Sequence, residues 1–112
     1  MECIYLLKNN KNGKVYVGKT RQFKERKYAH LANLRAKRHV NKMLQEDYNE
    51  YGEDAFIFEI AEETNSFFLN FEEQQWMLKL KTYDFKYGYN CKDPYFYSKQ
   101  YDKPTKNLPC NY

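Results

Sequence analysis

The stretch CIYLLKNNKNGKVYVG (residues 3–18) decides the fold of this chain. Its first three and last three residues have the apolar, β-branched and aromatic composition of strands, and the NNKNG run between them has the composition of a turn. The stretch therefore predicts a β-hairpin with one tyrosine in each arm, Tyr5 and Tyr16.

The turn of this hairpin decides which face of the sheet each tyrosine occupies. A four-residue loop over residues 9–12 places Tyr5 directly opposite Tyr16, with both phenols on one face. We expect a loop shifted by one residue to put the phenols on opposite faces. Two phenols on one sheet face, followed by a strongly basic helix, make this part of the chain a candidate functional site.

The rest of the chain predicts three helices and one further strand. We expect a helix with its N-cap at Thr20 and its end near Lys37, a shorter helix over about residues 41–51, a strand over residues 55–61 and a third helix over about residues 65–81. The third helix is apolar on most sides, which predicts burial against the sheet. The order β-β-α-α-β-α predicts a mixed α/β (α+β) fold, with helices flanking a small three-stranded antiparallel sheet.

The 112 residues suffice for one domain, expected over residues 1–93, and residues 94–112 read as an irregular tail rich in Tyr, Lys and Pro. The three cysteines are odd in number and have no CxxC spacing, so we expect no disulfide framework and a reducing compartment. No apolar run is long enough to span a membrane. These features predict a soluble, intracellular (cytoplasmic) protein without a membrane partner.

Charge is unevenly distributed along the chain. Residues 19–42 contain nine Lys or Arg and one acid, whereas residues 43–78 contain ten acids and no Lys or Arg. This pattern favours a phosphate-binding face with an acidic back, and the alternative is two solvated helical faces of opposite sign. The residues that we expect to contact DNA are Lys19, Arg21, Lys24, Lys27, Arg35, Lys37, Arg38 and His39.

Glu73 is the acidic residue most typical of a functional site. Its neighbours one turn away on the third helix are Leu69 and Met77, and a carboxylate in an apolar seam is costly unless something pairs with it. A divalent metal ion is one such partner, and an Arg from the first helix is the other. Glu72 points toward Lys79 and fits an ordinary surface acid.

Arg26 and His30 share the core-side stripe of the first helix. Taken singly, each fits a structural role, but the two together beside a tyrosine-bearing hairpin favour phosphate binding. Asn90 follows a Gly-Tyr pair, where a plain turn residue is the structural alternative.

In this order, the parts resemble the GIY-YIG nuclease superfamily, in particular its homing-type and stand-alone phage-type members. The resemblance covers residues 2–93 and departs from the family at Cys3, where Gly is usual. It rests on Ile4-Tyr5, Tyr16-Val17-Gly18, Arg26 with His30, His39, Glu73 and Asn90.

The resemblance implies metal-dependent hydrolysis of DNA phosphodiester bonds, one strand per active site. Glu73 would hold one Mg²⁺, with Mn²⁺ as an alternative, and Arg26 would neutralise charge on the phosphoryl oxygens. Asn90 would orient a phosphate or support the site.

The general base is left open between tyrosine and histidine. Tyr5 or Tyr16 would orient or deprotonate the attacking water, although a free phenol has a pKa of about 10 and needs nearby positive charge. His30 is the alternative base.

The main alternative function is a nucleic-acid-binding module that has the same fold without catalysis, which metal-dependent loss of phosphodiester bonds would exclude. We expect weak intrinsic sequence specificity, or specificity that a dimer or a partner protein supplies. Homing, phage or mobile-element, restriction and repair roles all remain open.

Overall fold

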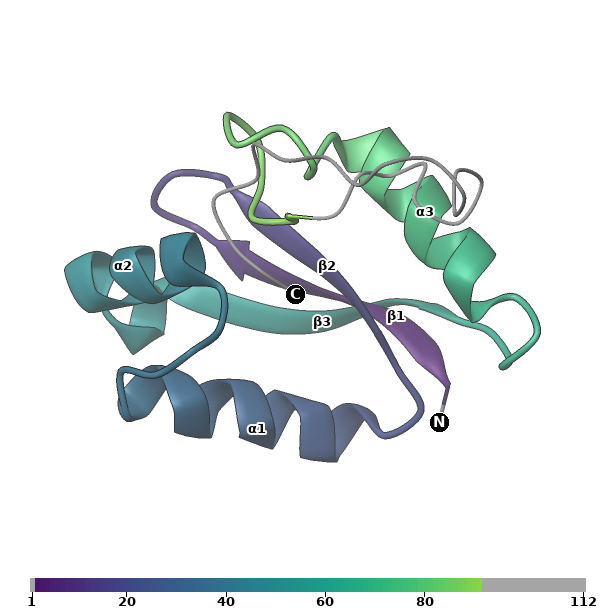
Figure 1. The fold of residues 1–112 in the computed structure, drawn as a ribbon, viewed down its shortest axis with the longest axis horizontal. Helices are drawn as coiled ribbons and strands as arrows, with labels where there is room; N and C mark the ends of the chain where they lie inside the picture. The colour runs from purple at the N-terminus through teal and green to yellow at the C-terminus, as the bar shows by residue number, and fades with distance from the viewer. Residues whose placement is uncertain (1, 92–112) are drawn as a thin grey trace.

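The computed structural model describes residues 2–91, which form one three-stranded sheet with helices on both faces (Figure 1). The strand order is β2-β1-β3, and both strand pairs are antiparallel. This confirms the expected mixed α/β fold and order of elements, whereas the predicted tail lies outside the described residues. The elements are β1 (Cys3–Asn9), β2 (Val15–Thr20), α1 (Phe23–Arg35), α2 (Lys42–Tyr51), the short 3₁₀ helix η1 (Glu53–Ala55), β3 (Phe56–Glu63) and α3 (Leu69–Leu80).

The β1–β2 turn is built by asparagine and glycine. The N–H of Asn9 donates to the carbonyl of Lys14 over 2.9 Å, which leaves residues 10–13 as a four-residue loop. The side chains of Asn9 and Asn12 accept hydrogen bonds from backbone N–H groups two residues on, and Gly13 has a φ of +79°. These are the local contacts that make this residue composition favour turns.

The register of the hairpin differs from the expected one. Tyr5 pairs with Gly18, and Tyr16 pairs with Leu7. The loop is shifted by one residue at both ends, which changes the pairing by two positions. Because side chains alternate with a period of two, the phenols still share a face, and our expectation that such a shift separates them is wrong.

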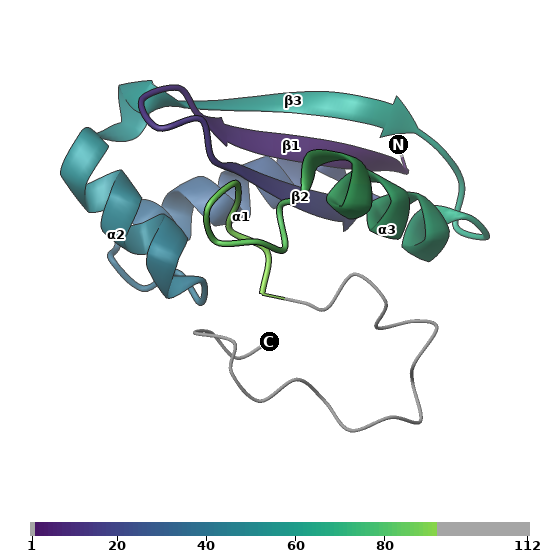
Figure 2. The same ribbon diagram turned by 90° about the horizontal axis from the view of Figure 1, so that it is seen from above.

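The two faces of the sheet carry two cores. Tyr5, Leu7 and Tyr16 pack with Leu34 of α1 and Leu44 of α2. The other face packs against α3, through a cluster of Ile4, Leu6, Val17, Leu69 and Met77. Figure 2 shows β2 as the edge strand closest to α3, so side chains from both layers can meet at this edge.

Helix α1 is shorter than expected at both ends. Thr20 is the last residue of β2 and not an N-cap, and its Oγ1 accepts a hydrogen bond from the N–H of Gln22 over 3.0 Å. The helix therefore begins at Phe23. Helix α2 agrees with the sequence: the Asn41 side chain accepts from the N–H of Leu44 at its start, and Gly52 follows its last residue with a φ of +86°.

Helix α3 buries only a narrow stripe. Leu69, Glu73 and Met77, spaced four apart, are its buried residues. The helix begins four residues later than predicted, so Phe67 precedes it and is 87% exposed, and Phe71 is exposed on its outer side. The expected burial on most sides is therefore wrong.

Cys3 is a fully buried free thiol, so a small side chain fits where glycine was expected. Cys91 is disulfide-bonded, which corrects our expectation from the odd number of cysteines. Among residues 2–91, no helix is long and apolar enough to cross a membrane.

Candidate active site

Tyr5 and Tyr16 are the two residues that the sheet contributes to the candidate site. Their ring centroids lie 6.3 Å apart on the face that α1 covers. Tyr5 is 1% exposed and Tyr16 is 6% exposed, so each ring is fixed by packing. The two phenols that the sequence placed on one face are therefore neighbours, although diagonal rather than directly opposite.

Gly18 makes room for the Tyr5 ring. A Cβ built on Gly18 would lie 2.2 Å from Tyr5 Cζ and 2.4 Å from Tyr5 Oη, far inside any normal contact. The Tyr5 ring therefore crosses its partner strand at the residue that lacks a side chain and carries the hydroxyl to the edge of the sheet. The sequence contained Gly18, but only the hairpin register reveals this role.

Arg26 reaches the site from α1. Its Nε–H donates to Tyr5 Oη over 3.2 Å. Burial lowers the pKa of Arg26, but the hydrogen bond to Tyr5 and the charges of Tyr5 and Tyr16 outweigh it, so the net shift is upward. Arg26 is thus a permanent cation beside both phenols.

His30 and His39 lie behind Tyr5. His30 Nε2 is 2.6 Å from Tyr5 Oη, and His30 Nδ1 is 2.7 Å from His39 Nε2. The planes of the two imidazoles are nearly parallel, at 13°, and their centroids lie 5.0 Å apart, as expected for rings joined edge to edge by this hydrogen bond. His39 is only 9% exposed, so the structure places it in the interior and not on a DNA-facing surface, contrary to our expectation.

Both histidines are neutral at physiological pH. Burial, followed by the charges of His39 and Arg26, lowers the pKa of His30 to about 3. Burial and Arg26 lower the pKa of His39 to about 4. Burial raises the pKa of Tyr5 well above its usual value; Tyr16 and Glu73 raise it further, while Arg26 opposes them.

Glu73 reaches the same edge of the sheet from α3. It is 4% exposed, and its Oε1 lies 3.7 Å from Lys19 Nζ. Lys19 also donates to the side chain of Asn70, one turn earlier on α3. A cation beside Glu73 is therefore Lys19 of β2, a partner that the sequence did not suggest. The adjacent Glu72 does not behave as expected, because a hydrogen bond with Glu62 raises its pKa.

Asn90 supports the edge strand. Its Oδ1 accepts from the N–H of Val17, and its Nδ2 donates to the carbonyl of the same residue, both over 2.8 Å. The amide thus pairs with β2 as a neighbouring strand would, between Tyr16 and Gly18. Of the two roles that the resemblance implied, these contacts match support of the site.

A family model described as the GIY-YIG catalytic domain matches residues 1–88. The chain belongs to the GIY-YIG family. Two solved structures are similar to it over most of its length. One is the catalytic domain of the homing endonuclease I-TevI, with 30% identity and a TM-score of 0.75, covering 83% of this chain and 100% of that chain.

The other similar structure is the catalytic domain of the intron endonuclease I-TevI with one glutamate replaced by alanine. It has 31% identity and a TM-score of 0.71, covering 80% of this chain and 93% of that chain. No curated protein sequence matches the chain. The family model and these two structures show that this GIY-YIG domain is a nuclease and therefore an enzyme.

The metal-ligating groups of this GIY-YIG domain are few. Within residues 2–91, no three His, Cys, Asp or Glu side chains gather as a cluster that could hold an ion. A single buried carboxylate, Glu73, nevertheless fits Mg²⁺, which binds through one or two carboxylates and keeps several of its waters.

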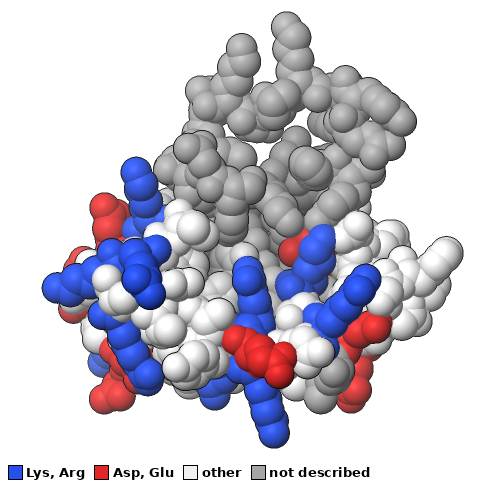
Figure 3. Space-filling model, turned by 60° about the horizontal axis from the view of Figure 1, so that its bottom comes forward, with Lys and Arg blue, Asp and Glu red and all other residues white. Residues whose placement is uncertain are grey.

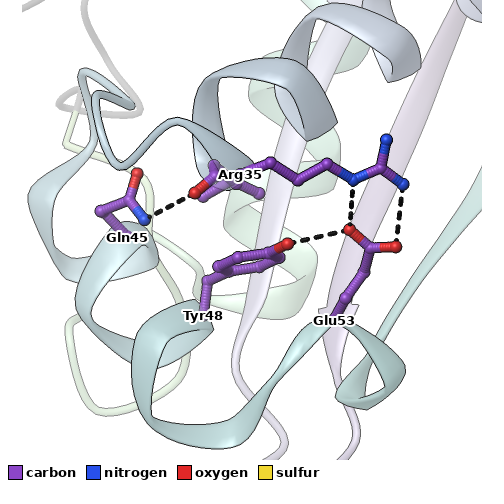
Figure 4. Close-up of polar contacts among 5 residues, drawn as sticks. Arg35, Gln45, Tyr48 and Glu53 are labelled. Atoms are coloured by element: carbon purple, nitrogen blue, oxygen red, sulfur yellow. Dashed lines mark hydrogen bonds and ion pairs between the residues drawn. The ribbon is translucent and has the colours of Figure 1, made fainter.

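Most cations of the basic segment are exposed, and one of them, Arg35, is held by a carboxylate. Figure 3 shows Lys and Arg side chains across the underside of the domain, with Asp and Glu among them. Arg35 is bound to Glu53 by two hydrogen bonds of 2.7 and 2.9 Å, and Tyr48 donates to the same carboxylate (Figure 4). These contacts lower the pKa of Glu53 to about 2. Arg35 is exposed, as are Arg21, Lys24, Lys27, Lys37 and Arg38 of the predicted DNA-binding set.

Proposed function

We propose that this GIY-YIG nuclease hydrolyses phosphodiester bonds of DNA with a divalent metal ion, cutting one strand per active site. The observation that carries the proposal is the meeting of groups from three elements at the β2 edge. Tyr5 of β1 hydrogen-bonds to Arg26 of α1, and Glu73 of α3 is close enough for its charge to raise the pKa of Tyr5.

Glu73 is the residue that would hold the ion. A carboxylate buried to this degree is stabilised by positive charge, and Lys19 at 3.7 Å already supplies part of it. When bound, Mg²⁺ or Mn²⁺ would act as a Lewis acid toward the scissile phosphate.

Arg26 and Lys19 would bind the phosphate. Arg26 is exposed although its Nε–H is bonded to Tyr5, so a phosphate can approach this side chain. Its planar arrangement of N–H donors matches phosphoryl oxygens, whose negative charge grows in the transition state. Lys19 adds a second positive charge on the Glu73 side.

The hydrogen-bond pattern favours tyrosine over histidine as the group that acts on the attacking water. His30 contacts Tyr5 with one ring nitrogen and His39 with the other, and its pKa of about 3 makes it a weak base. Burial raises the pKa of Tyr5, which favours the neutral phenol over the phenolate that would accept a proton. Arg26 stabilises the phenolate form, and a nearby metal ion would do the same.

DNA is the substrate that we infer, with exposed cations such as Lys24 and Lys27 neutralising backbone phosphates. Recognition of a particular sequence is assigned to a dimer or a partner protein.

The first test is cleavage of supercoiled plasmid by the purified protein in Mg²⁺, in Mn²⁺ and in EDTA. We expect metal-dependent relaxed product, and a loss of at least about a hundredfold in rate for Glu73→Ala, as for removal of a group that stabilises transition-state charge. Glu72→Ala is the matched control, because this neighbouring carboxylate faces Glu62 and should leave the rate unchanged.

Intact plasmid in every reaction, together with a gel shift that shows bound DNA, would contradict the proposal. That result would instead favour a module with the same fold that binds nucleic acid without cleaving it. Equal losses in Glu73→Ala and Glu72→Ala would remove the specific role of Glu73.

A further inference from the structure

The backbone N–H of Asn41 fixes the proton of His39. It donates to His39 Nδ1 over 3.0 Å. A backbone N–H can only donate, so Nδ1 must accept and carries no proton. The His39 imidazole therefore carries one proton, on Nε2. This holds at every pH at which the Asn41 N–H donates to Nδ1.

His39 in turn fixes the proton of His30. The protonated Nε2 of His39 lies 2.7 Å from His30 Nδ1, so His30 Nδ1 is the acceptor. The proton of His30 must then lie on Nε2, which is 2.6 Å from Tyr5 Oη. His30 therefore donates to the phenol, and neither of its nitrogens is available to take a proton from a water or from Tyr5.

Tyr5 Oη accepts two hydrogen bonds, one from His30 and one from the Nε–H of Arg26. A phenol oxygen has one proton and two acceptor positions, which these donors occupy. The Tyr5 proton must point in the remaining direction, away from both donors. The same two donors would stabilise the phenolate once the proton has left.

The surroundings of His39 keep this arrangement in place. Its backbone N–H donates to Gln45 Oε1 over 3.0 Å, and Gln45 Nε2 donates to the carbonyl of Leu34 at the end of α1. Both imidazoles are buried, so water does not compete for their nitrogens. Among residues 2–91, no charged side chain forms a hydrogen bond or an ion pair with His39.

We propose that His39 is a positioning residue: its tautomer, set by the Asn41 N–H, makes His30 a hydrogen-bond donor to Tyr5 and directs the Tyr5 hydroxyl proton away from His30 and Arg26. This inference rests on the proposed function for its catalytic consequence. It excludes His30 as the general base and leaves that role to a tyrosine. No covalent step involves His39.

The tautomers can be measured directly by NMR on the full chain labelled with ¹⁵N-histidine. The chain has two histidines, so the imidazole spectrum contains four nitrogens. We expect a ¹⁵N–¹⁵N coupling across the hydrogen bond between the two rings, with the proton attached to His39 Nε2. A proton on Nδ1 of either ring would overturn the proposal.

The kinetic consequence is tested with two variants at one position. His39→Leu removes the donor to His30 Nδ1, which frees His30 to adopt the other tautomer and accept the Tyr5 proton. We expect kcat to fall at least about tenfold with KM unchanged, because a proton-transfer group is misdirected while phosphate contacts remain. His39→Gln places an amide N–H near the position of Nε2 and should restore most of the rate.

Two further results decide the interpretation. Equal kcat losses in both variants, or an unchanged His30 tautomer in His39→Leu, would show that His39 is only a packing residue and overturn the proposal. A wild-type protein that cleaves no DNA would contradict the proposed function alone, since the NMR measurement requires no substrate.

Discussion

Gly18 shows how one residue can determine an active site without contributing a functional group. The Tyr5 ring occupies the space in which any side chain at position 18 would lie. Tyr5 then reaches Arg26 and His30 with a single oxygen atom. The position of that oxygen depends on the absence of a methyl group on the neighbouring strand.

We predict that Gly18→Ala displaces the Tyr5 hydroxyl and lowers kcat by about a hundredfold, the cost of a misplacement of about 1 Å at a reacting group. Gly52→Ala is the matched control. Its φ of +86° makes alanine unfavourable there, but a Cβ would meet nothing within 4 Å and the site is unaffected. The control should therefore lose thermal stability and keep its kcat. A fully active Gly18→Ala would show that the Tyr5 position is not critical.

At the scale of elements, different sides of helix α1 contribute residues to the core and to the candidate site. His30 and Leu34 are buried, and Arg26 points to Tyr5. Its outward cations Lys24 and Arg35 are both exposed, but Arg35 is held by both oxygens of Glu53. A cation already paired with a carboxylate gains less from a phosphate.

We predict that Lys24→Gln lowers the slope of log K against log salt for DNA binding by about 0.9, the value for one lost phosphate contact. Arg35→Gln should change this slope much less, because its charge is compensated by Glu53 before DNA binds. Fluorescence anisotropy with a short duplex at several salt concentrations measures both slopes. Equal effects of the two substitutions would mean that DNA displaces Glu53.

At the scale of the whole molecule, the two buried histidines link stability to pH. Their folded pKa values, about 3 and about 4, lie below the ordinary value of 6.5. The unfolded chain therefore binds more protons between these values. The stabilisation is fully present above the unfolded pKa and is lost as the pH falls toward the folded values.

We predict that the free energy of unfolding falls by about 2 kcal/mol per histidine between about pH 8 and about pH 5. Urea titrations at several pH values measure this loss. The protein has no other histidine, so a His30→Gln/His39→Gln double variant should show little change over the same range. A wild type whose stability is constant over the range would mean that the imidazoles are accessible to protons when folded.

Much of the fold followed from the sequence because it depends on local patterns. The hairpin, α2 and the third strand were predicted from turn residues, a helical face of apolar residues and alternating apolar positions, which act within a few residues. The misplaced boundaries had other causes. Thr20 had the chemistry of an N-cap, but pairing with Cys3 kept it in β2, and the apolar run before α3 was not part of the helix.

For the site, the sequence by itself determined which residue types were present and the family that they resemble. It could not determine that Lys19 lies beside Glu73, that Arg35 is held by Glu53, or that His39 is buried against His30. These contacts join residues from different elements, so they depend on strand register and helix packing. Only the tertiary structure decided them, because hydrogen bonds act over about 3 Å, a distance that sequence spacing does not specify between separate elements.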